Sequence, residues 1–128
     1  MFTRYAIYYA PTAGSSLGIF GNSWLGWDIN TATETPRPSI HNLPDSIENL
    51  TKTPQKYGFH GTLKAPFHLV DGHDIDDLKQ AVEDFAKTRR AFELGKLRIS
   101  NLGNFITLTQ TEPSDQLVTL ASECVMEL

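Results

Sequence analysis

The stretch from residue 57 to residue 86 restricts the fold most, because a strand pattern and a helix pattern follow each other directly. Polar and apolar side chains alternate over residues 57–70, which predicts a β-strand, and Pro66 places its later part at a sheet edge or a bulge. Asp74 then predicts the N-cap of a helix. The apolar stripe of that helix is Ile75, Leu78, Val82, Phe85 and Ala86. A strand and a helix in succession predict an α+β fold.

Three more strands are predicted by segments rich in aromatic and β-branched residues. Residues 2–10 end at Pro11 and predict a buried strand with two different faces. One face carries Tyr5, Ile7 and Tyr9, and the other carries Arg4, Ala6 and Tyr8. Residues 92–100 and 104–110 flank a turn at residues 101–103 and predict a hairpin. We therefore expect an antiparallel or mixed sheet of four to five strands with helices packed on it.

Three more helices are expected between and after these strands. A short amphipathic helix is predicted within residues 15–28 despite two glycines, and another over residues 45–51 after a long loop at residues 30–43. Ser114 can cap a last helix, whose apolar stripe runs to the final residue. Because no helix stop signal follows that stripe, we expect that the protein has, or once had, a longer form.

The composition suits a single domain over residues 1–128, since 40% of the residues are hydrophobic. The net charge of −4 provides no basic field, so we expect neither generic nucleic-acid binding nor attraction to a membrane surface. Cys124 is the single cysteine, and its place on the apolar stripe of the last helix predicts a buried small hydrophobe. The N-terminus lacks the pattern of a secretory signal, which favours a cytoplasmic location.

His60, Thr62 and Lys64 form the row of side chains that can carry chemistry. Their spacing of two would point all three side chains to one face of a strand. Histidine can remove a proton from an attacking hydroxyl or give one to a leaving oxygen. A threonine hydroxyl can donate a hydrogen bond to a phosphoryl oxygen, and a lysine adds positive charge where negative charge develops. The row predicts half of an acid-base site for phosphoryl transfer, with His60 and Thr62 as the catalytic pair.

Three segments, residues 4–11, 24–28 and 57–67, carry a resemblance that spans essentially the whole chain. With them the chain resembles the N-terminal lobe of the DUF1045-like family of phosphonate-metabolism proteins, which belongs to the 2H phosphoesterase superfamily. The resemblance implies two similar α+β lobes, each of which gives one His-x-Thr to a shared cleft. One histidine would act as base and the other as acid on a phosphodiester or cyclic phosphate. The resemblance implies no metal and no cofactor.

The chain departs from that pattern because it holds a single His-x-Thr. None of the other histidines, His41, His68 and His73, has a threonine two residues later. A missing C-terminal lobe could complete the acid-base pair. A second copy could also complete it by placing its own His60 across a twofold axis, which predicts a homodimer. The alternative function is a noncatalytic ligand-binding or assembly module that retains one lobe.

The neighbouring polar residues have alternative explanations. Lys64 could bind the phosphorylated substrate or, as an edge-strand lysine, oppose aggregation. Arg4 and Tyr8 could bind substrate or serve packing and surface roles. A metal site near His73 is disfavoured, because the acidic residues there are explained by the start of a helix.

Overall fold

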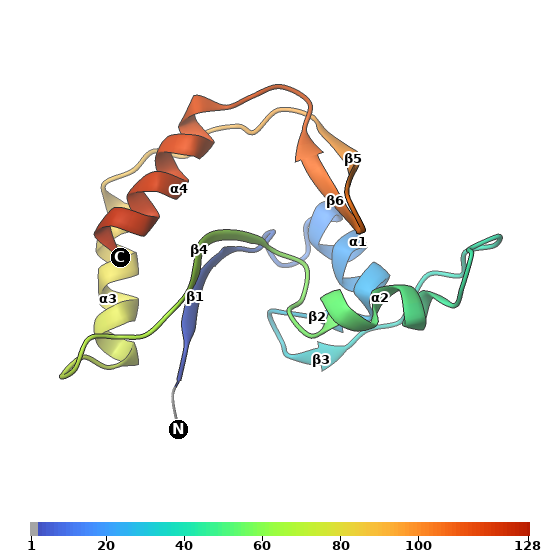
Figure 1. The fold of residues 1–128 in the computed structure, drawn as a ribbon, viewed down its shortest axis with the longest axis horizontal. Helices are drawn as coiled ribbons and strands as arrows, with labels where there is room; N and C mark the ends of the chain where they lie inside the picture. The colour runs from blue at the N-terminus through green and yellow to red at the C-terminus, as the bar shows by residue number, and fades with distance from the viewer. Residues whose placement is uncertain (1–2) are drawn as a thin grey trace. The chain divides into compact units, whose positions relative to one another are not determined.

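The computed structural model describes residues 3–128, and Phe2 of the first predicted strand lies outside them. Four helices and six strands make up the described chain (Figure 1). Their order is β1 (Tyr5–Tyr9), α1 (Ser16–Leu25), β2 (Trp27–Asp28), β3 (Thr33–Glu34), α2 (Ile47–Gln55), β4 (Gly61–Phe67), α3 (Ile75–Lys87), β5 (Leu97–Leu102), β6 (Phe105–Gln110) and α4 (Asp115–Glu127). The predicted α+β class is confirmed.

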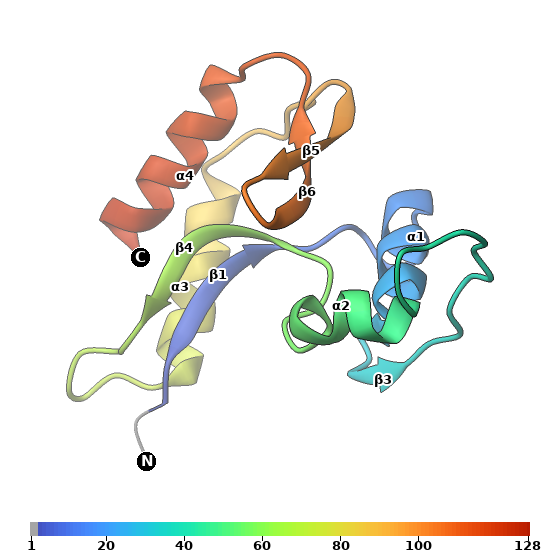
Figure 2. The same cartoon turned by 45° about the vertical axis from the view of Figure 1, so that its right-hand side comes forward.

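The strands pair only two at a time, so the predicted sheet of four to five strands is wrong. β1 pairs with β4, as Figure 2 shows, β2 with β3, and β5 with β6. An alternating sequence indicates which residues are extended, but it does not say which extended segments will pair. The predicted burial of the first strand is wrong too, because a two-stranded sheet covers little of it. Four residues of β1 are half-buried, and Tyr9 is 49% exposed.

The chain divides into two compact units. The inserted unit is Tyr8–Thr62, and the terminal unit is Met1–Ile7 together with Leu63–Leu128. The single domain over residues 1–128 stays a prediction.

In the inserted unit, α1 and α2 pack against each other. The hydroxyl of Ser15 accepts a hydrogen bond from the Gly18 amide and caps α1, which ends at Gly26 in the left-handed conformation. The side chain of Arg37 holds the long loop in place. Its Nη1 donates to the Trp24 carbonyl at 2.8 Å and to the buried Thr51 hydroxyl at 2.7 Å.

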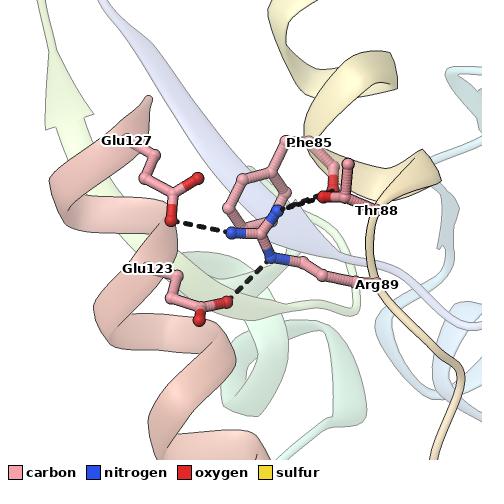
Figure 3. A network of polar contacts seen from close by, with 5 residues as sticks. All are labelled: Phe85, Thr88, Arg89, Glu123 and Glu127. Carbon is pink, nitrogen blue, oxygen red and sulfur yellow. Dashed lines mark hydrogen bonds and ion pairs between the residues drawn. The ribbon is translucent and has the colours of Figure 1, made fainter.

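In the terminal unit, α3 begins with a reciprocal capping box between Asp74 and Asp77, as its sequence predicts. One arginine ties the end of this helix to α4 (Figure 3). Arg89 donates to Glu123 at 2.8 Å and to Glu127 at 2.9 Å, and its guanidinium lies 3.3 Å from the centre of the Phe85 ring.

β5 and β6 form the predicted hairpin, with Leu102 opposite Phe105. The two residues between them, Gly103 and Asn104, make the turn, and Gly103 has a φ of +64°. The turn therefore lies later than the predicted residues 101–103. β5 also begins at Leu97, five residues after the predicted start at residue 92.

No helix within residues 3–128 has both the length and the apolar character needed to cross a membrane. The cytoplasmic location stays a prediction.

Candidate functional site

His60 lies at the end of a turn that follows α2, and not inside a strand. The amide of Tyr57 donates to the Pro54 carbonyl at 3.0 Å, and the amide of Gly58 donates to the Gln55 carbonyl at 3.2 Å. Gly58 has a φ of +73°, which an alternating strand cannot contain. β4 therefore begins at Gly61, and the strand predicted over residues 57–70 is too long at both ends.

Gly58 and Phe59, the two residues before His60, pack closely against other residues and hold this turn in place. A Cβ atom on Gly58 would lie 2.8 Å from Cβ of Ile29, so the buried glycine backbone touches that side chain directly. The Phe59 ring lies against Gly21 of α1, where a methyl group would overlap the ring. The two glycines thus allow close contacts that any larger side chain would prevent.

Two contacts define the orientation of the His60 ring. Nδ1 lies 2.9 Å from the Gly58 carbonyl oxygen. Because a carbonyl can only accept, Nδ1 must carry the proton and donate it. In neutral His60 this leaves the lone pair on Nε2, which can then accept a proton. The ring also stacks on Tyr8, with 3.8 Å between ring centroids and an interplanar angle of 22°.

The structure brings together only some of the predicted site residues. Tyr8 and His60 are in contact, both are half-buried, and Thr62 is exposed two residues later in β4. Lys64 belongs to the terminal unit. Its ammonium lies 3.5 Å from the Val125 carbonyl and 4.4 Å from the centre of the Phe67 ring.

Arg4 is exposed at the start of the terminal unit, next to β1. The catalytic roles of His60 and Thr62 and the binding roles of Lys64, Arg4 and Tyr8 stay predictions.

His68 and His73 contact nearby groups of the terminal unit. His68 Nδ1 lies 3.1 Å from the Thr3 carbonyl, and His73 Nδ1 lies 3.2 Å from an Asp77 carboxylate oxygen. Among the residues that the structure describes, no three histidine, cysteine or acidic side chains gather as a metal site would require.

Cys124 on α4 is 1% exposed, which confirms the predicted buried small hydrophobe. Burial raises the pKa of its thiol above the ordinary value. A thiol held in its neutral form is a poor nucleophile, so Cys124 is a packing residue.

The sequence pattern did not identify Gly58 as part of the candidate site. The available signal was a glycine two residues before the candidate histidine, because glycine is the residue that most readily adopts a left-handed conformation. The stack of Tyr8 on His60 had no local signal, because it depends on the pairing of β1 with β4.

Two curated proteins are similar to nearly the whole chain, and both are named "Ribose 1,5-bisphosphate phosphokinase PhnN". The protein from Janthinobacterium sp. (strain Marseille) is 35% identical over 96% of this chain and 27% of its own length. The protein from Laribacter hongkongensis (strain HLHK9) is 29% identical over 98% of this chain and 30% of its own length. The chain thus spans less than a third of these relatives, and no solved structure matches it.

One family model matches residues 62–128, which is more than half of the chain. It begins at Thr62, two residues after His60, and covers nearly all of the terminal unit. On this match, the chain belongs to the family described as "Protein of unknown function (DUF1045)".

Proposed function

We propose that this chain supplies half of a metal-independent phosphoesterase site of the 2H type. In this site, His60 moves a proton and Thr62 donates a hydrogen bond to a phosphoryl oxygen. The observation that carries the proposal is the hydrogen bond from His60 Nδ1 to the Gly58 carbonyl. Because Nδ1 is occupied, Nε2 is the nitrogen that exchanges protons, and this division of roles is typical of a catalytic histidine.

The proposed reaction cleaves a phosphodiester or a cyclic phosphate. Neutral Nε2 can remove the proton from an attacking water, whereas protonated Nε2 can give a proton to the leaving oxygen. His60 supplies one of these two roles. A second histidine must supply the other, from another part of a longer protein or from a second copy of the chain.

The similar curated proteins suggest the class of substrate. Their printed name states that they act on ribose 1,5-bisphosphate, which is a phosphate ester of ribose. We therefore place the proposed substrate among small phosphorylated ribose compounds, and the function in phosphonate metabolism. The net charge of −4 implies that the phosphate is attracted by local groups and not by the overall field.

The test is hydrolysis of a 2′,3′-cyclic nucleotide by the purified chain in the presence of a chelator. Wild type is compared with His60→Ala and with His41→Ala, which removes an exposed histidine of the inserted unit. We expect turnover that only His60→Ala abolishes. Turnover that is equal in all three proteins, or that the chelator stops, would contradict the proposal. No turnover in any of them would mean that this chain alone is not an enzyme.

The second candidate is a noncatalytic assembly module, and the β5–β6 hairpin favours it. Ile99 and Ile106 are 74% and 75% exposed, and an isolated two-stranded hairpin is marginally stable in water. A partner surface, including that of a second copy, would stabilise it. Sedimentation of wild type and Ile106→Lys tests this candidate. Association that the substitution weakens would support it, and a strictly monomeric wild type would contradict self-assembly.

A further inference from the structure

We propose that Tyr8 is a positioning residue for His60, which keeps the imidazole in the orientation that leaves Nε2 available for proton transfer. This inference rests on the proposed function, because it concerns the same histidine. In this role Tyr8 orients His60, whereas its place in the sequence suggested that it contacts the substrate directly.

The Gly58 carbonyl oxygen is the fixed partner of the His60 ring. Gly58 is buried, has a φ of +73° and touches Ile29 directly, so its backbone has little freedom to move. Its carbonyl oxygen therefore provides a fixed acceptor for Nδ1 at 2.9 Å. A hydrogen bond to a fixed acceptor determines which ring nitrogen carries the proton.

The Tyr8 ring is a second restraint on the His60 ring. An imidazole held at one atom can still swing about its side-chain torsions, and a flipped ring would exchange Nδ1 for a carbon atom. The Tyr8 ring lies parallel to His60 within 22° and at 3.8 Å between centroids. Such a stacked aromatic contact covers one face of the imidazole and opposes both motions.

Tyr8 reaches His60 through the pairing of two strands. Tyr8 belongs to β1, which pairs with β4, and β4 begins directly after His60. Strand pairing therefore sets the position of the tyrosine ring, and α2 with its following turn sets that of the histidine. The role requires the ring of Tyr8 and not its hydroxyl.

The test compares Tyr8→Phe, which keeps the ring, with Tyr8→Leu, which removes it. Tyr9→Leu is the matched control, because Tyr9 is the next residue of β1 and is 49% exposed. Two-bond ¹⁵N–¹H correlation spectra of the histidines report the tautomer of His60 directly. We expect protonated Nδ1 and upfield-shifted ring protons in wild type, Tyr8→Phe and Tyr9→Leu. Tyr8→Leu should lose the upfield shift and show a mixture of tautomers.

Backbone amide spectra verify that each variant is folded, and Tyr8→Met is the second variant if Tyr8→Leu is not. A folded Tyr8→Leu or Tyr8→Met with wild-type His60 signals would overturn the role of Tyr8. Where turnover is measurable, Tyr8→Leu should lower kcat by about tenfold or more at similar KM, because it disturbs orientation and not binding. Tyr8→Phe should restore kcat to within about twofold.

The two proposals can fail separately. Altered His60 tautomers in Tyr8→Leu, together with turnover that does not depend on His60, would overturn the proposed function alone. His60-dependent turnover with unchanged tautomers and kcat in Tyr8→Leu would overturn the role of Tyr8 alone.

Discussion

The carbonyl oxygen of Gly58 accepts a hydrogen bond from Nδ1 of His60 at 2.9 Å. This contact spans only two residues, yet it depends on a left-handed glycine that packs against Ile29. The orientation of the candidate catalytic ring therefore depends on packing inside the inserted unit. Substitutions that disturb this packing should alter His60 even where they do not touch it.

Gly21→Ala should destabilise the chain, because the added methyl group would overlap the Phe59 ring. Overpacking of this kind costs about 1–3 kcal/mol of unfolding free energy. Urea unfolding followed by circular dichroism measures the change. Gly61→Ala is the control, since its added methyl group would meet no atom within 4 Å beyond residue 61 and its two chain neighbours. It should change stability by less than about 0.5 kcal/mol. Equal stability of Gly21→Ala and wild type would show that Phe59 can move away.

Arg37→Ala should loosen the long loop of the inserted unit. The Arg37 side chain is 15% exposed and donates to the half-buried Trp24 carbonyl and the buried Thr51 hydroxyl, so its loss leaves both without this donor. We expect a loss of about 1–3 kcal/mol in unfolding free energy. Proteolysis should also cleave the loop faster. Arg90→Ala removes an exposed arginine and should leave both measurements unchanged. An equal effect of the two substitutions would indicate a general effect of charge.

Cys124 should make the free energy of unfolding depend on pH in the alkaline range. Burial raises the pKa of its thiol, so the folded chain retains a proton that the unfolded chain releases. Stability should therefore be unaffected below the pKa of an exposed thiol, about 8.5, and should fall as the pH rises above it. Chemical denaturation between pH 7 and pH 10 measures this slope. Cys124→Ala should reduce the slope, and an identical slope in both proteins would refute the prediction.

Arg89→Met should lower the Tm of the terminal unit, because it removes the link between α3 and α4. Part of the effect should disappear at high salt, since the pairs with Glu123 and Glu127 are charged and partly exposed. Thermal unfolding at low and high salt separates this part from the loss of contact with Phe85. A Tm that is unchanged at low salt would contradict a stabilising role.

Local patterns predicted the presence of all four helices, although α2 ends at Gln55 and not at the predicted residue 51. The predicted caps Asp74 and Ser114 are the N-caps of α3 and α4, and the side chain of each accepts a hydrogen bond from an amide of the first turn of its helix. Such caps depend on a few neighbouring residues, so the sequence displays them directly. The burial of Cys124 followed in the same way from the stripe of α4.

The strands and the candidate site were predicted less well, because they depend on contacts between distant segments. The alternating pattern continued through Gly58, yet the left-handed glycine and the turn after α2 moved the strand start to Gly61. His60 therefore lies outside the strand that was expected to orient it. The pairing of β1 with β4, which carries Tyr8 to His60, could not be inferred from either segment alone.

Binding of a phosphate ester at His60 tests the proposed half-site most directly, because it does not require the second histidine. A 2′- or 3′-nucleoside monophosphate is titrated into labelled protein, and the side-chain ¹⁵N signals of all four histidines are followed. We expect saturable shifts of His60 Nε2 and of the Thr62 amide, with His41 and His73 unchanged. Thr62→Val should weaken the binding. Saturable shifts at the other histidines, with His60 unmoved, would contradict a phosphoesterase half-site at His60.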